Sequence, residues 1–151
     1  MTIRHIAAGV VLALAPVATA ASAEDFEIRM LNEGPDGKTM VFEPALLEVE
    51  IGDTVTFVPT DRGHNATSME AMIPAGAAGW DGAISEPVSV TFAVEGTYGY
   101  ICEPHYGLGM VGLILVGDPT RNFDTARSVR QRGQAARRFD DLFHEAAAMS
   151  D

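Results

Sequence analysis

Residues 98–110 read Tyr-Gly-Tyr-Ile-Cys-Glu-Pro-His-Tyr-Gly-Leu-Gly-Met, and the rest of the chain is patterned to hold this stretch. It contains the single cysteine of the chain, Cys102, with His105 three residues later and Met110 five residues beyond that. Another histidine, His64, lies upstream in Asp-Arg-Gly-His-Asn. One thiolate, two imidazoles and one thioether form a mixed sulfur and nitrogen ligand set, which is typical of a blue-copper site.

The ligand types favour copper over zinc. Thiolate and thioether sulfur suit Cu(I), and imidazole is a common copper ligand, so this set serves a metal that changes charge by one electron. Structural zinc sites use four Cys or His ligands, and catalytic zinc sites keep one position open for water. The chain has no second cysteine to complete a zinc set.

The spacing of the three downstream ligand candidates is short enough for one loop between two strands to supply them all. Gly107 and Gly109 give that loop backbone freedom, and Pro104 stiffens it. Taken singly, a lone cysteine is more often a small buried hydrophobe, and a lone methionine is core filler. An unpaired cysteine in an exported protein nevertheless requires a reason, and its combination with His and Met at these spacings predicts a metal site.

Motifs that match a known family run through most of the chain. They are Met30-Leu31-Asn32, Met40–Ala45, Gly52–Phe57, Gly63-His64-Asn65, Met72-Ile73-Pro74, Cys102, Pro104-His105-Tyr106, Gly109-Met110 and Val116-Gly117-Asp118. On these residues the chain resembles the pseudoazurins, small periplasmic type 1 copper proteins of the cupredoxin superfamily.

The resemblance implies one copper ion held by His64, Cys102, His105 and Met110. It further implies that Asn65 braces the ligand loops by hydrogen bonds, that Met40 packs beside the ring of His105, and that Pro104 stiffens the loop next to the ligands. By the same resemblance, His105 reaches the surface through an apolar patch. We therefore expect the partners to be redox proteins, a copper nitrite reductase or a c-type cytochrome, that dock around His105.

The first segment is predicted to be a cleavable signal peptide, residues 1–23. Arg4 provides a positive start, Ile6–Leu14 a short apolar run, and Ala21-Ser22-Ala23 a cleavage-site pattern. The apolar run is too short for a transmembrane helix, which disfavours the alternative of a membrane anchor. We expect a periplasmic, monomeric protein with no stable membrane insertion.

The charge balance excludes one class of partner. The chain has 10 Lys and Arg residues against 21 Asp and Glu residues, so nucleic-acid binding is not expected. Pseudoazurins typically carry a ring of lysines on the copper face, whereas this chain has one lysine, Lys38. We therefore hypothesise a partner less acidic than the usual nitrite reductase of the family, because charge complementarity controls the rate of encounter.

Short alternating runs separated by turn residues predict strands. They are Phe26–Met30, Leu47–Ile51, Thr54–Val58, Val88–Phe92, Gly96–Ile101 and Val111–Val116. The second and third runs, joined by Gly52-Asp53, are predicted to pair as a hairpin. Residues 69–86 are expected to form a long excursion in which Trp80 packs the loop, with a role as redox way-station as the alternative. The predicted fold is an all-β, cupredoxin-like Greek-key sandwich or barrel over residues 24–118.

Residues 119–151 are predicted to form two short helices packed on the same domain. Asn122 is a candidate cap for a helix that runs to about residue 130. An amphipathic helix follows, whose apolar positions are Ala135, Phe139, Leu142, Phe143 and Ala146. Its arginines form either a docking patch or, as favoured, a solvated helix face.

Three classes of function remain to be compared. Four protein ligands leave no open position for a substrate, so we expect a non-enzymatic electron carrier. The resemblance to pseudoazurins implies that it serves a denitrification or respiratory chain. A copper enzyme would need further histidines for a catalytic metal, and the predicted mature chain retains only His64, His105 and His144. Copper trafficking or storage is the alternative, and copper exchange with a chelator would distinguish it from a carrier.

Overall fold

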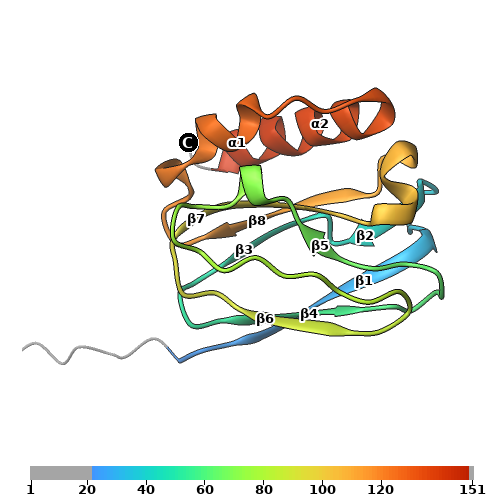
Figure 1. Cartoon of the computed structure of the whole chain (residues 1–151), viewed down its shortest axis with the longest axis horizontal. Helices are drawn as coiled ribbons and strands as arrows, with labels where there is room; N and C mark the ends of the chain where they lie inside the picture. Colours follow the sequence, from blue (N-terminus) through green and yellow to red (C-terminus); the bar gives the residue numbers. More distant parts are fainter. Residues whose placement is uncertain (1–21, 150–151) are drawn as a thin grey trace, which may run out of the picture.

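The computed structural model describes residues 22–149, and within this range eight strands form two sheets packed face to face (Figure 1). One sheet has the order β2 (Thr39–Glu43), β1 (Asp25–Glu33), β4 (Thr54–Val58) and β6 (Val88–Thr91). The other has the order β3 (Leu46–Val49), β8 (Val111–Val116), β7 (Gly96–Ile101) and β5 (Thr67–Ser68). Both are mixed, because β1–β4 and β3–β8 are parallel pairs. The sheets do not close, so the predicted sandwich is confirmed and the barrel is not.

The predicted hairpin of residues 47–58 is wrong. β3 pairs with β8, and β4 pairs with β1 and β6 in the opposite sheet. Residues 50–53 therefore cross between the sheets. Asp53, nearly buried at 3% exposed, holds the crossing by accepting hydrogen bonds from the backbone N–H groups of Glu24 and Glu50. The alternation of each strand was correctly predicted, but its partner was not, because pairing is decided by distant segments.

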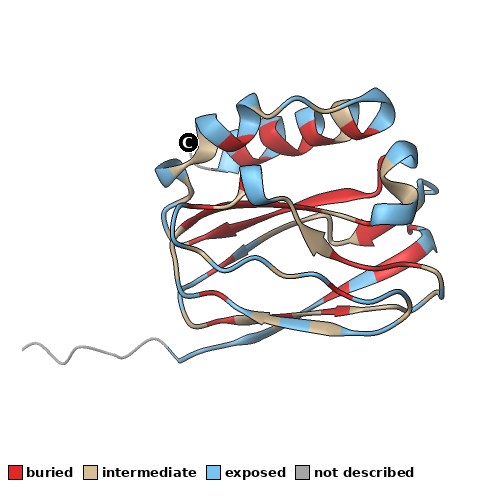
Figure 2. Cartoon of the chain, in the orientation of Figure 1, coloured by how far each residue is buried: buried red, intermediate tan, exposed pale blue. Residues whose placement is uncertain are grey.

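Strand β8 is buried along its whole length (Figure 2). Its side chains point alternately into two cores. Ile114 and Val116 belong to the core between the sheets, and Val111 and Leu113 belong to a second core under the helices. A strand covered on both faces reads as a continuous apolar run, as this one does. The ligand stretch that precedes β8 is thus joined to a strand that is held in both cores.

Helices α1 (Phe123–Ser128) and α2 (Gly133–Met149) cover the outer face of the β3-β8-β7-β5 sheet (Figure 1). The five apolar positions predicted for α2 are its buried residues, which confirms the amphipathic helix. The predicted cap is wrong in one respect. Asn122 occupies the N-cap position of α1, but its side chain bonds the backbone N–H and C=O of Thr97 on β7. It therefore ties the helical layer to the sheet.

The excursion predicted for residues 69–86 contains one turn of 3-10 helix, η1 (Glu70–Met72). Trp80 stacks on Phe57 with the ring centroids 5.7 Å apart, which confirms its packing role. A last 3-10 turn, η3 (Pro119–Arg121), leads into α1. No helix in the described range is long and apolar enough to cross a membrane. The predicted signal peptide falls almost entirely outside the described residues.

Candidate metal centre

The loop between β7 and β8 carries three of the predicted ligands. It forms a 3-10 helix, η2 (Glu103–Leu108), with Pro104 in its first turn, where a missing N–H costs nothing. Gly109 ends it in the left-handed conformation (φ 83°). The backbone N–H of Cys102 then donates to Met110 O at 2.9 Å, which extends the β7–β8 ladder by one pair. Cys102 and Met110 are therefore held opposite each other by the two strands, and both are fully buried.

His64 comes from a separate segment between β4 and β5. Gly63 precedes it with φ 92°, and the Gly63 N–H donates to the hydroxyl of Ser85 at 2.8 Å. The carbonyl of His64 accepts from the N–H of Ser85 at 2.8 Å. Two hydrogen bonds to one residue of the 69–86 excursion thus fix the backbone of His64, whose side chain is fully buried.

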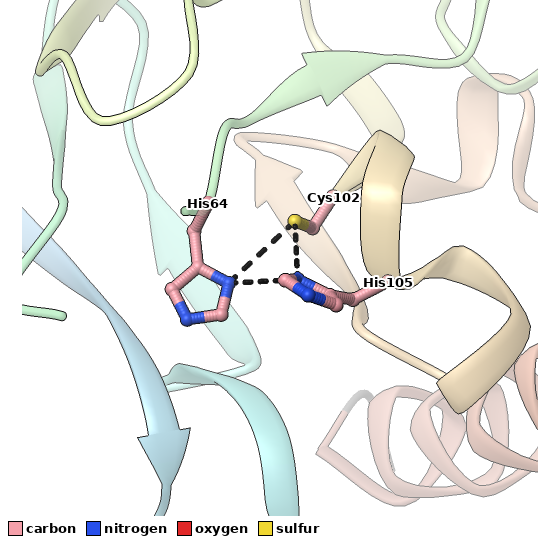
Figure 3. Close-up of side chains that lie close together, drawn as sticks. All are labelled: His64, Cys102 and His105. Carbon is pink, nitrogen blue, oxygen red and sulfur yellow. Dashed lines mark hydrogen bonds between the residues drawn. The ribbon is translucent and has the colours of Figure 1, made fainter. Parts of the chain in front are cut away.

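The side chains of His64, Cys102 and His105 point toward one another (Figure 3). The Nδ1 atoms of the two histidines are 3.0 Å apart. Cys102 Sγ lies 3.8 Å from Nδ1 of His64 and 3.4 Å from Nδ1 of His105. A point about 2 Å from all three atoms lies inside this triangle, close to the length of a metal–imidazole bond. The triangle therefore fits a single metal ion.

The outer nitrogen of His64 is also fixed. Nε2 lies 2.9 Å from Oδ1 of Asn32, and because an amide oxygen can only accept, Nε2 carries the proton. The Nδ1 atom of a neutral His64 then presents its lone pair to the centre. Such hydrogen bonds orient metal-ligating histidines. Sequence reasoning assigned Asn32 no role in the site; its place in the Met-Leu-Asn motif was the available signal.

Burial governs the protonation of the site. It lowers the pKa of His64, helped by neighbouring His105 and opposed by Asp61, so the neutral, metal-binding imidazole is favoured. Burial also raises the pKa of the Cys102 thiol. A bound cation reverses this second effect, because a coordinating thiol is deprotonated outright. The donor atoms, the tautomer of His64 and the spacing thus fit copper, which binds both thiolate and imidazole ligands.

Asn65 links the two ligand segments. Its Oδ1 accepts from the backbone N–H of Glu103 at 2.9 Å, and its Nδ2 donates to a carboxylate oxygen of Glu103 at 2.8 Å and to Gly82 O at 3.0 Å. Because Asn65 follows His64 and Glu103 follows Cys102, these bonds tie neighbouring residues of the two segments together. The predicted bracing role of Asn65 stays a prediction, and these hydrogen bonds are the contacts on which it depends.

The remaining predicted residues lie around this group. Met40 packs against the buried core cluster that includes Cys102 and Met110. Pro104 is exposed at the start of η2. The structure therefore brings His64, Cys102 and His105 together, places Met110 beside Cys102 through the backbone, and leaves Pro104 at the surface.

Known proteins are similar to this chain in sequence and in fold. Residues 28–117 match the copper binding proteins of the plastocyanin/azurin family. The pseudoazurin of Methylorubrum extorquens is 41% identical over 144 residues, which cover 95% of this chain and 97% of that protein. The chain belongs to the pseudoazurin family. Pseudoazurin from Paracoccus pantotrophus is 40% identical over 90% of this chain and 93% of its own.

Solved pseudoazurin structures have the same cupredoxin fold. The crystal structure from Hyphomicrobium denitrificans superposes with a TM-score of 0.76 at 41% identity and covers 80% of this chain and 97% of that one. Membership of the pseudoazurin family makes this chain a copper-binding electron-transfer protein. The group formed by His64, Cys102 and His105 is arranged to hold its one copper ion.

Proposed function

We propose that this chain is a periplasmic, mobile one-electron carrier whose copper ion is held by His64, Cys102, His105 and Met110. The observation that carries the proposal is the triangle of two Nδ1 atoms and Cys102 Sγ. Bound copper supplies a Cu(II)/Cu(I) couple. The residues hold the donor atoms on two tethered segments, so little ligand movement is needed when the charge changes.

His105 is the exit for the electron in this proposal. His64 and Cys102 are buried, whereas His105 is half-buried. Leu108, on the same 3-10 helix, is 46% exposed. An apolar surface next to the exposed edge of His105 suits weak, brief docking, and interfaces of this kind are small.

The partners we propose are redox proteins, either a copper nitrite reductase or a c-type cytochrome, within a denitrification or respiratory chain. The acidic charge balance of this chain supports a partner that is less acidic than the usual nitrite reductase of the family, such as a c-type cytochrome. The single lysine, Lys38, is already paired with Asp36 at 2.8 Å, so it offers little free positive charge. Stopped-flow rates measured against salt would test this choice, because a rate that falls steeply with salt for an acidic reductase would contradict it.

We further propose that residues 1–23 are removed on export and that residues 24–118 form the cupredoxin domain. Residues 119–151 then belong to the same domain as a helical cover rather than to a separate unit. The core under α2 includes both Leu113 of β8 and Phe139 of α2, which supports one domain that includes the helices. The mature protein is expected to be a monomer.

The visible absorption spectrum of the mature protein with Cu(II), taken before and after ascorbate, tests the proposal. A strong thiolate-to-copper band that bleaches on reduction and returns on reoxidation is the expected result. A colourless protein that binds copper weakly would contradict the carrier function. Copper trafficking is the alternative, and rapid release of copper to a chelator would support it.

A further inference from the structure

Arg138 of α2 reaches across to the β1–β2 hairpin. Its Nη1 donates to Met40 O at 2.9 Å, and its Nη2 donates to Thr39 O at 2.9 Å. The two acceptors are consecutive carbonyls, 98 and 99 residues away in the chain. A planar guanidinium with two parallel donors suits such a pair, whereas an ammonium is a single point charge.

The backbone that Arg138 holds is strained. Met40 has φ 54°, a left-handed conformation that side chains other than glycine rarely adopt. Such a residue persists only where its surroundings over-determine it. The two hydrogen bonds from Arg138 are one such constraint, and the tight turn at Gly37 (φ 79°) that precedes β2 is another.

Met40 is linked both to Arg138 and to residues around the metal centre. The β1–β2 register pairs Leu31 with Val41 and Glu33 with Thr39, which places Met40 opposite Asn32. Asn32 is the residue that accepts from Nε2 of His64. The side chain of Met40 packs against the cluster that contains Cys102 and Met110. Its backbone thus adjoins the support of one histidine, and its side chain packs against the core cluster to which both sulfur-bearing residues belong.

We propose that Arg138 is a positioning residue of the copper centre, which seats Met40 against the ligand cluster by holding the Thr39 and Met40 carbonyls. This inference rests on the proposed function. Without Arg138, the Met40 backbone relaxes toward an ordinary strand conformation. Its side chain then leaves the cluster and admits water beside the ligands, and Asn32 shifts with its neighbour.

The test compares three variants of the mature protein. Arg138→Met keeps an apolar stem and removes every donor. Arg138→Lys restores a charge but supplies a point donor in place of the fork. Arg137→Met is the matched control, because Arg137 is exposed on the same helix, its side chain makes no hydrogen bond or ion pair within residues 22–149, and the variant loses the same charge.

Five measurements separate positioning from stability. In the metal-free protein, the Met40 methyl resonance and the thermal midpoint are recorded. In the copper protein, three quantities are recorded: the thiolate-to-copper absorption band, the reduction potential of the copper ion, and the rate of copper release to a chelator. Arg138→Met is expected to move the Met40 resonance, change the band and potential, and speed release about tenfold, the scale seen for groups that orient ligands. Arg138→Lys should lie between Arg138→Met and the unaltered protein, and Arg137→Met should match the unaltered protein.

Two outcomes would overturn the inference. In one, Arg138→Met lowers the thermal midpoint but leaves the resonance, band, potential and release rate unchanged, so Arg138 only clamps the helix. In the other, Arg137→Met changes the copper measurements as much as Arg138→Met does, so the loss of one positive charge accounts for the effect. Failure of the proposed function is distinct, because it is seen in the unaltered protein as the absence of a thiolate band.

Discussion

Asn32 and His64 lie 32 residues apart in the chain, yet Oδ1 of Asn32 is 2.9 Å from Nε2 of His64. The bond fixes both the proton and the orientation of a fully buried imidazole. It connects β1, an interior strand of one sheet, to a ligand segment that leads into the other sheet. The metal centre therefore depends on how the two sheets are placed.

Replacing Asn32 by Leu should weaken copper binding by roughly 10–100-fold, because the His64 ring loses the acceptor that orients it. Asn32→Asp keeps an acceptor oxygen and is the matched control, expected to retain most of the affinity. Competition titrations of Cu(I) against a chelator measure both. Equal affinities for the Leu and Asp variants would contradict the role of the hydrogen bond.

Cys102→Ser should abolish the intense visible band while the fold persists. Serine is close to cysteine in size, and the backbone N–H of residue 102 still bonds Met110 O. A hydroxyl is a much poorer ligand for Cu(I) than a thiolate. Absorption and circular dichroism spectra check the two parts separately. A surviving band would show that the sulfur is not a ligand.

Asn65→Ala should destabilise the protein by about 1–3 kcal/mol, because Gly82 O and the Glu103 N–H lose a buried partner. The ligand segments should also separate more readily, so copper should leave faster. Denaturant unfolding of the metal-free protein gives the first effect and chelator exchange the second. Unfolding at an unchanged denaturant concentration would mean that water replaces the amide without cost.

Phe139→Ala should cost about 3–5 kcal/mol, since the side chain is 2% exposed in the core beneath α2. Arg137→Ala on the same helix is the control and should change stability by less than about 0.5 kcal/mol. A single unfolding transition that moves as a whole would support one domain. Loss of α2 alone, with the β-sheets intact, would contradict it.

Gly112→Ala should destabilise the protein by about 1–3 kcal/mol through overpacking. An added Cβ would lie 2.3 Å from the ring and hydroxyl of Tyr100 on the neighbouring strand. Gly107→Ala is the control, because nothing lies within 4 Å of its Cβ position. Thermal unfolding of both variants measures the difference, and equal midpoints would contradict close packing at residue 112.

The local elements could be predicted because each follows from a short-range pattern. Thr54–Val58, Gly96–Ile101 and Val111–Val116 coincide with β4, β7 and β8. The strands β2 (Thr39–Glu43) and β5 (Thr67–Ser68) were not predicted, and the other failures were long-range. The alternation of apolar and polar residues over 47–51 and 54–58 is the same whether the two strands pair with each other or lie in different sheets. Only the competing partners β8 and β1 decide which sheet each strand joins.

The sequence by itself determined the ligand types, their spacing in one loop, the apolar face of α2 and the family to which the chain belongs. These depend on residue identity and on periods of two to four residues. The tertiary structure decided which sheet each strand joins, that Asn32 supports His64, and that Arg138 holds Met40. Those contacts join residues 32 and 98 positions apart. No local pattern specifies them, because they form only after the two sheets and the helical layer have packed.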